Sequence, residues 1–241
     1  PAKWEGFQPL PEGFRHVAWD DLDALDAAID YTVAAVLLEP VQGEGGVNPA
    51  SVEYLQGVRR ICSERGVLMM VDEVQTGLGR TGRWFGHQVA GIVPDVVTMA
   101  KALGNGVPVG ACWAPAGIAG AFEPGDHATT FGGQPLAMAA ARAVLAVMEA
   151  EDVPSRAARA GERIKELARA IPGIASTRGA GLLLGLALDD GIDARAVATA
   201  CLDAGLVVNA VTPTTLRLAP SLLVTDDEID AALDIIREAL A

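Results

Sequence analysis

Short apolar runs alternate with amphipathic stretches along the chain, and this alternation is the feature that most limits the folds open to it. Residues 33–38, 67–71 and 95–100 have the pattern of buried strands, whereas residues 50–65 and 134–149 have the pattern of helices. Strands separated by helices are typical of β-α-β units around a parallel sheet. We therefore predict an α/β fold with a mainly parallel sheet, joined by a less regular strand at residues 107–113.

The pattern changes near residue 151, where acidic residues and Pro154 interrupt the apolar periodicity. We expect a large domain over residues 1–150 and a small α+β domain over residues 151–241. Thr225 and Glu228 have the spacing of a capping box and predict the start of the last helix. The other elements expected in the small domain are a charged helix at 155–170, a strand at 181–188, a helix at 193–204, and short strands at 206–209 and 216–218.

Composition excludes several classes of protein. Of 241 residues 51% are hydrophobic, which excludes a disordered chain, and 18 basic against 31 acidic residues give a net charge of −13. This sign disfavours binding to nucleic acid. Cys62, Cys112 and Cys201 lack C-x-x-C spacing, which disfavours disulfides and a metal site and fits a reducing cytoplasm. No apolar run reaches the roughly 18 residues of a membrane span, so we expect a soluble, cytoplasmic protein.

Two charged residues at predicted strand ends are candidates for chemistry. Asp72, with Glu73 beside it, follows the strand at 67–71, and ligands of parallel sheets gather beyond such ends; the alternative is that Asp72 caps a turn. Lys101 follows the strand at 95–100 and is one of three lysines, the others being Lys3 and Lys165. Burial lowers the pKa of an amine toward the range where it attacks carbonyls. The alternative is a lysine that extends from the strand end to solvent.

Glycine-rich loops surround these positions. Residues 77–82 match G-x-G-x-x-G, but no helix start and no acidic residue at the required distance follow, so a dinucleotide site is disfavoured. Residues 39–46 form a second acidic, glycine-rich loop after a strand. Residues 127–135 place hydroxyls and glycines before a helix, which suits contacts to an anion. Each loop alone is more often a structural turn, but together they indicate a site.

These segments, in this order, resemble the class III pyridoxal-phosphate aminotransferases, and within them the acetylornithine aminotransferase group. The interval from Asp72 to Lys101, 101 − 72 = 29 positions, also agrees with that family. The resemblance implies a PLP-dependent transferase fold of type I, with residues 1–150 as the C-terminal part of the cofactor-binding large domain. The matching segments are EPVQGEGG (39–46), DEVQTGLGRTG (72–82), KALGNGVP (101–108) and HATTFGGQP (127–135).

The resemblance also implies a role for each matching residue. Lys101 would form the Schiff base with pyridoxal 5′-phosphate and move a proton, and Asp72 would pair with the protonated pyridine nitrogen. Val74 would pack on one face of the cofactor ring, and Gln75 would lie near its phenolic oxygen. Thr130 would contact the phosphate bound by the partner subunit, which implies a homodimer with shared active sites.

Glu44 and Arg217 form a second implied set, for substrates. The glutamate would mask the arginine while a terminal amine is bound, and would release it to bind the carboxylate of glutamate or 2-oxoglutarate. Arg217 on the surface of a small-domain strand is the alternative. Arg178 also lies in a segment that matches the family, and we interpret it as mainly structural.

The resemblance implies transfer of an amino group from N2-acetyl-L-ornithine to 2-oxoglutarate, giving N-acetyl-L-glutamate 5-semialdehyde and L-glutamate in arginine biosynthesis. Ornithine, succinylornithine and 4-aminobutyrate aminotransferases are alternatives, and so is a non-catalytic fragment that needs its N-terminal half. The chain begins at Pro1 and lacks the family's N-terminal phosphate loop. We therefore expect the isolated chain to bind the cofactor weakly and to be nearly inactive.

Overall fold

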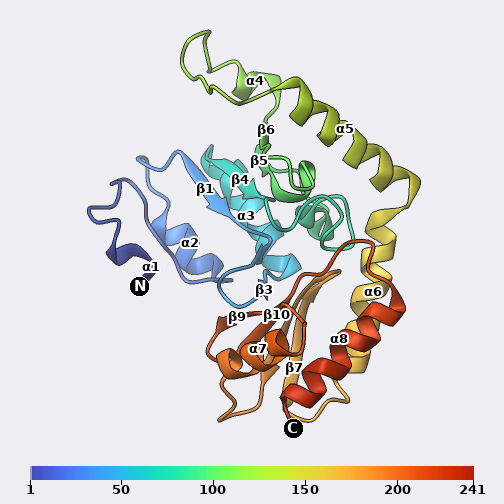
Figure 1. The fold of residues 1–241 in the computed structure, drawn as a ribbon. Helices are drawn as coiled ribbons and strands as arrows, with labels where there is room; N and C mark the ends of the chain where they lie inside the picture. Colours follow the sequence, from blue (N-terminus) through green and yellow to red (C-terminus); the bar gives the residue numbers. More distant parts are fainter. Residues whose placement is uncertain (1) are drawn as a thin grey trace.

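The computed structural model describes residues 2–241, so Pro1 lies outside the described part of the chain. Its strands form two four-stranded sheets and one two-stranded hairpin (Figure 1). The first sheet has the order β1-β4-β5-β6 and the second the order β7-β8-β10-β9. The hairpin pairs β2 (Val41–Gln42) with β3 (Asn48–Pro49). This architecture agrees with the predicted α/β fold.

The first sheet is parallel except at one edge. β1 pairs with β4 and β4 with β5 in parallel, whereas β6 pairs with β5 antiparallel. The predicted strand at 107–113 is shorter than expected: a turn in which Val107 N–H donates to Gly104 O ends at Val107, and residues 108–110 have no regular secondary structure. The strands are β1 (Ala35–Leu38), β4 (Leu68–Asp72), β5 (Val96–Met99) and β6 (Ala111–Trp113).

Helix α3 (Val52–Arg65) covers the first sheet and connects β3 to β4. The Ser51 side chain accepts the Tyr54 N–H at its start, and Gly66 ends it in the left-handed region at φ 68°. Leu55 on α3 and Met69 on β4 are fully buried in the same core cluster. Burial of such a side chain stabilises the fold by about 1.5–3 kcal/mol.

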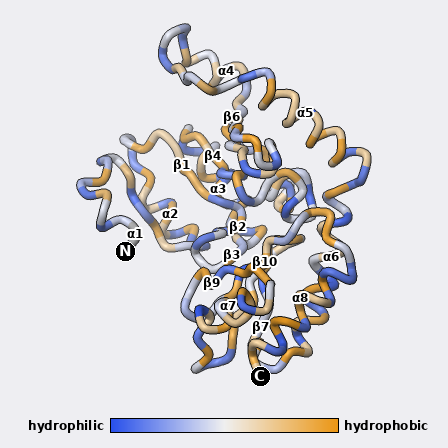
Figure 2. Tube along the Cα trace, in the orientation of Figure 1, coloured by the Kyte–Doolittle hydropathy of each residue, from blue (hydrophilic) through white to orange (hydrophobic). Residues whose placement is uncertain are grey.

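Shorter elements surround this sheet. They are α1 (Ala2–Glu5), α2 (Leu22–Ala28), the 3-10 turns η1 (Gly86–Ala90) and η2 (Lys101–Leu103), and α4 (Ala116–Ala119). Long helix α5 (Pro135–Ala150) follows, close to the predicted bounds. Figure 2 shows α5 as hydrophobic along much of its length, and on it Leu136 is 72% and Val147 48% exposed.

The second sheet is antiparallel throughout. Its core cluster packs Leu184 and Leu186 of β8 against Ile164 of α6 and Ile236 of α8. The capping box of α8 is present as predicted, since Thr225 and Glu228 exchange hydrogen bonds. The elements are α6 (Val153–Ala168), β7 (Ile174–Ala180), β8 (Leu183–Leu188), α7 (Ala194–Asp203), β9 (Asn209–Thr212), β10 (Thr215–Leu218) and α8 (Asp226–Ala239).

Two sequence expectations for this region need correction. The sequence pattern does not predict strand β7, because its residues after Ile174 are polar or small and none of its residues is fully buried. The strand expected at 206–209 lies instead at Asn209–Thr212, where pairing with β10 fixes it. Among the described residues, no helix combines the length and apolar character that crossing a membrane requires.

Candidate active site

Three charged side chains lie at the ends of neighbouring parallel strands. Glu39 directly follows β1, Asp72 is the last residue of β4, and Lys101 comes two residues after the end of β5. Because β1, β4 and β5 are adjacent and parallel, their carboxyl ends meet at one edge of the sheet. The structure therefore brings the predicted pair Asp72 and Lys101 together.

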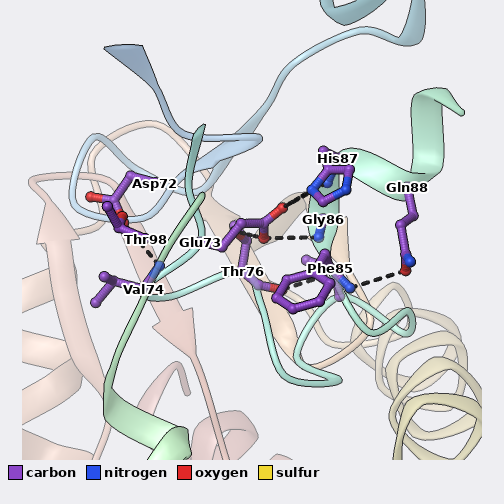
Figure 3. Close-up of polar contacts among 10 residues, drawn as sticks. Asp72, Glu73, Val74, Thr76, Phe85, Gly86, His87, Gln88 and Thr98 are labelled. Atoms are coloured by element: carbon purple, nitrogen blue, oxygen red, sulfur yellow. Dashed lines mark hydrogen bonds and ion pairs between the residues drawn. The ribbon is translucent and has the colours of Figure 1, made fainter. Parts of the chain in front are cut away.

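The Asp72 carboxylate is held by two local donors (Figure 3). Its Oδ1 accepts the Val74 N–H at 2.9 Å and the Thr98 hydroxyl at 3.2 Å. Thr98 lies opposite Asp72 in the pairing of β4 and β5. Both bonds go to Oδ1, so Oδ2 can accept a donor from a ligand. The turn that the alternative interpretation expected is therefore present, and it orients the carboxylate.

Lys101 has an unusual backbone. Its φ is 46°, in the left-handed region that residues other than glycine seldom adopt. Such conformations cost about 1–3 kcal/mol and cluster at functional sites. Lys101 opens η2 and is exposed, and it lines a large cleft. The alternative interpretation, in which Lys101 extends to solvent, agrees with this exposure. The solvent-exposed side chain lines the cleft.

That cleft has a volume of about 1100 Å³. Val74, Gln75 and Lys101 line it together with residues of α5 and the segment Ala219–Leu223 after β10. Residues near both sheets therefore line the same cleft, and Lys101, Val74 and Gln75 are among them.

Glu39 shows how closely these charges are spaced. Its carboxylate is partly buried, and this burial raises its pKa above the ordinary value. The Gly43 N–H, which donates to Glu39 Oε2 at 3.0 Å, opposes that shift. The negative charge of Asp72 adds to the rise and the positive charge of Lys101 reduces it. The acidic loop after β1 therefore shares an electrostatic environment with the pair.

Glu44 and Arg217 meet although 173 positions separate them. Arg217 Nη1 lies 2.5 Å from Glu44 Oε1, and the Arg217 side chain is 13% exposed against 58% for Glu44. The same Nη1 is 3.4 Å from Gln75 Oε1. A Cβ at Gly43 would lie 2.5 Å from the Gln75 amide, so the loop approaches Gln75 closely because residue 43 is glycine. The predicted substrate pair thus adjoins the cleft.

Thr130 stands apart from the other predicted residues. It lies in the segment between α4 and α5, where it is exposed, and it does not line the cleft described above. The structure of this single chain does not bring Thr130 to Lys101.

Glu73, which the sequence pointed to only as the neighbour of Asp72 and without a role of its own, is buried (Figure 3). It is 1% exposed. Its Oε1 accepts the N–H and ring Nδ1 of His87 at 2.9 and 2.8 Å, and its Oε2 accepts the Gly86 N–H at 2.8 Å and the Thr76 hydroxyl. In the sequence, only its position directly after Asp72 pointed to Glu73. The carboxylate fixes the turn that carries Val74 and Gln75.

The loop at 77–82 has a packing role. Gly82 has φ 85°, and a Cβ there would lie 2.9 Å from the Ala158 Cβ on α6. Leu182 N–H donates to Arg80 O, and Arg80 Nη1 donates to Leu182 O and Pro220 O. Burial lowers the pKa of Arg80 to about 10. The loop after β4 therefore packs against α6 and the second sheet. No helix begins between this loop and η1, which disfavours a dinucleotide site.

The chain belongs to the class III aminotransferases, because that family model matches residues 5–240. It is 48% identical to the acetylornithine aminotransferase of Corynebacterium efficiens, with 100% of this chain and 60% of that protein covered. It is also 48% identical to the acetylornithine aminotransferase of Mycolicibacterium smegmatis, over 96% of this chain and 60% of that protein. The chain thus spans about 60% of the length of these relatives.

Solved structures show the same fold. An ornithine aminotransferase from Toxoplasma gondii, described with partial occupancy of PLP at its active site, matches with a TM-score of 0.93 and 36% identity, over 98% of this chain and 57% of that one. The acetylornithine aminotransferase of Elizabethkingia anophelis matches with a TM-score of 0.88 and 32% identity, over 95% of this chain and 63% of that one. The expected fold type and family are thereby confirmed.

Proposed function

We propose that the protein carrying this chain is an N2-acetyl-L-ornithine aminotransferase that uses pyridoxal 5′-phosphate. It would transfer the terminal amino group to 2-oxoglutarate, giving N-acetyl-L-glutamate 5-semialdehyde and L-glutamate, a step of arginine biosynthesis. The observation that carries the proposal is the placement of Asp72 and Lys101 at the ends of adjacent strands β4 and β5, with Lys101 lining the cleft. The acetylornithine aminotransferases at 48% identity support the choice of substrate.

The residues present suit this cofactor. A primary amine at Lys101, an apolar face at Val74 and an amide at Gln75 line one cleft, and the Asp72 carboxylate lies at the neighbouring strand end. The amine can react with the cofactor's aldehyde, and the apolar side chain can pack on its aromatic ring. The amide can donate to its phenolic oxygen, and the carboxylate can accept from its protonated ring nitrogen. When bound, pyridoxal phosphate supplies an aldehyde carbon that condenses with amines and a ring that withdraws electrons from the substrate carbon.

Each residue would act through its own chemistry. Lys101 Nζ would hold the aldehyde carbon and, once displaced by the substrate amine, would carry a proton between the substrate carbon and the cofactor. Asp72 Oδ2 would accept a ring N–H, while Val74 N–H and Thr98 fix the other oxygen. A carboxylate in this position favours the protonated ring nitrogen through its negative charge.

Glu44 and Arg217 would let one cleft accept two kinds of substrate. With the ion pair closed at 2.5 Å, the Arg217 guanidinium is neutralised and a substrate reacting through its terminal amine is accommodated. When Glu44 moves away, the planar fork of Arg217 binds the carboxylate of 2-oxoglutarate in a bidentate manner. The exposure of Glu44, 58%, is consistent with a side chain that has room to move.

The domain division and the assembly belong to the same proposal. A boundary near residue 151 is supported by the two largest core clusters, which lie within residues 25–90 and 157–236, while two smaller clusters join the two sides. A homodimer with Thr130 reaching the partner's phosphate is supported by the exposure of Thr130 and its segment. A cytoplasmic location is supported by the free cysteines Cys62, Cys112 and Cys201.

A complementation experiment tests the shared active site. Two inactive variants, Lys101→Ala and Thr130→Asp, are mixed. Activity should return in mixed dimers only if Thr130 of one subunit acts with Lys101 of the other.

Borohydride reduction of the protein at its full encoded length, followed by peptide mapping, tests the central assignment. We expect the reduced cofactor on Lys101 alone, and none in Lys101→Arg, which keeps the positive charge. Lys165 serves as an internal control, because it pairs with Glu162 on α6 at 2.9 Å and does not line the cleft. Label on Lys165, or no label at all, contradicts the proposal.

Ornithine aminotransferase activity is the second candidate, since an ornithine aminotransferase matches the fold with a TM-score of 0.93. The two activities differ in whether the donor's α-amine is acetylated. Comparison of kcat/KM for N2-acetylornithine, ornithine, succinylornithine and 4-aminobutyrate separates them. A higher value for ornithine than for N2-acetylornithine would replace the first candidate with the second.

A further inference from the structure

Arg178, Gly185 and Arg217 form one row across three neighbouring strands. In the pairing of β7 with β8, Arg178 lies opposite Gly185, and in the pairing of β8 with β10, Gly185 lies opposite Arg217. Residues directly opposite one another on adjacent strands point to the same face of a sheet. Two arginines therefore flank a position without a side chain, and the gap between them is open to another segment.

The segment in that gap is the loop that carries Glu44. A Cβ at Gly185 would lie 3.1 Å from the Val47 Cβ and 3.2 Å from Gly46 O, so a larger residue would displace the loop. Val47 is fully buried and packs with Leu183 of β8. The end of the Glu44 loop thus rests directly on the second sheet, between the two arginines.

The Arg178 side chain fastens the loop there. Its Nε donates to Gly46 O at 2.9 Å and to Val47 O at 3.1 Å, while Nη2 donates to the Thr215 hydroxyl at 3.0 Å. Thr215 lies on β10 two residues before Arg217, on the same face. One guanidinium therefore joins the backbone two residues after Glu44 to the strand that carries the ion-pair partner of Glu44.

The acceptors distinguish Arg178 from Arg217. Arg178 binds three neutral oxygens of the protein, whereas Arg217 binds the Glu44 carboxylate. The rigid planar fork of arginine suits simultaneous contact with several acceptors, and the single ammonium of lysine cannot reproduce it. The loop approaches without a Cβ at Gly46, where φ is 115° and a Cβ would lie 3.2 Å from Arg178 Nη2.

We propose that Arg178 is a positioning residue for substrate selection: by fixing the loop backbone at Gly46 and Val47, it holds Glu44 in register with Arg217 and so sets the balance between the two half-reactions. This inference rests on the proposed function of the Glu44–Arg217 pair. When the Arg178 contacts are lost, the Glu44–Arg217 ion pair forms less often. The half-reaction with the terminal amine then weakens, while the half-reaction with 2-oxoglutarate, which needs a free Arg217, does not.

The test measures each half-reaction separately, by stopped-flow absorbance of the cofactor in the protein at its full encoded length. In Arg178→Met and Arg178→Lys, we expect the ratio of kcat/KM for N2-acetylornithine to kcat/KM for 2-oxoglutarate to fall about tenfold. Coupling of this size is typical of residues in one hydrogen-bond network. In a Glu44→Gln background, where the carboxylate is already absent, the same substitutions should leave the ratio unchanged.

Arg163→Met is the matched control. Arg163 ties α6 to Asp230 of α8 at 2.6 Å, away from the Glu44 loop, so its loss lowers stability without altering the ratio. Amide hydrogen exchange at residues 45–48 provides a readout independent of turnover and should accelerate in Arg178→Lys. If Arg178→Met fails to fold, the lysine variant carries both measurements.

Three results would overturn the proposal, and they can be told apart. An equal loss in both half-reactions assigns Arg178 a general structural role. A ratio change that persists in Glu44→Gln shows that Arg178 does not act through Glu44. An unchanged ratio in Glu44→Gln alone, in an active transaminase, removes the function proposed for the Glu44–Arg217 pair, and with it the basis of this inference.

Discussion

Replacement of Glu73 by glutamine should destabilise the protein strongly, although the two side chains have nearly the same shape. Glu73 is buried and accepts donors at both oxygens. One donor at each oxygen is a backbone N–H, that of His87 at Oε1 and that of Gly86 at Oε2. A backbone N–H can only donate, so an amide NH₂ faces a second donor in either orientation.

The expected cost follows from that geometry. In either orientation one hydrogen bond to a charged acceptor is lost, worth about 1.5–3 kcal/mol. The backbone N–H that loses it stays buried without an acceptor, which costs about 1–3 kcal/mol more. The Thr76 hydroxyl and the His87 ring can adapt, because each can also accept. We therefore expect a loss of about 2.5–6 kcal/mol in the free energy of unfolding.

Urea unfolding followed by circular dichroism measures this loss as a shift in the midpoint at constant slope. Glu64→Gln is the matched control, since Glu64 pairs with Arg60 on the exposed side of α3 at 3.1 Å and should lose less than about 0.5 kcal/mol. A loss below about 1 kcal/mol in Glu73→Gln would refute the reasoning. It would mean that the turn after Asp72 rearranges to supply an acceptor.

Further predictions concern packing, titration and capping. Gly161→Ala should cost about 1–3 kcal/mol by calorimetry, because its Cβ would lie 2.0 Å from Gly181 O. Gly117→Ala, with nothing within 4 Å, should gain about 0.5–1 kcal/mol, and equal effects would contradict the contact at Gly161. Burial raises the pKa of the Cys62 thiol to about 11 from 9.0. The thiol therefore ionises at lower pH in the unfolded chain than in the folded protein, so the free energy of unfolding should fall as pH rises from 9 to 11, by at most about 2–3 kcal/mol. In Cys62→Val, denaturation curves should show a smaller decline over this pH range. An unchanged decline would contradict the assignment to Cys62. Thr225→Ala should cost about 1 kcal/mol in urea unfolding, and no loss would show that the capping box is dispensable.

Much of the fold could be predicted from the sequence because the signals were local. The apolar runs of β4 and β5 and the caps of α3 and α8 lie within a few residues of the elements that they define. Strand β7 has no such signal, since Ile174–Ala180 is mostly small or polar and is only partly buried. It becomes a strand because β8 offers an edge with which it pairs along its length.

The candidate site divides in a similar way. Asp72, Val74, Gln75 and Lys101 follow adjacent parallel strands, and parallel topology alone brings strand ends together. Their chemical roles were inferred from the family resemblance and stay predictions. The role of Glu73 was missed because it comes from burial and from the donors of His87, which no sequence pattern shows.

The sequence by itself determined the strand and helix pattern, the family and the positions of its lysine and carboxylate, because each depends on local periodicity or on a continuous motif. Only the tertiary structure decided which distant groups meet. Arg217 reaches Glu44 across 173 positions, and Arg178 reaches Gly46 across 132. These contacts exist because the second sheet docks against the loop after β2, and no local sequence preference specifies where two separately formed surfaces come into register.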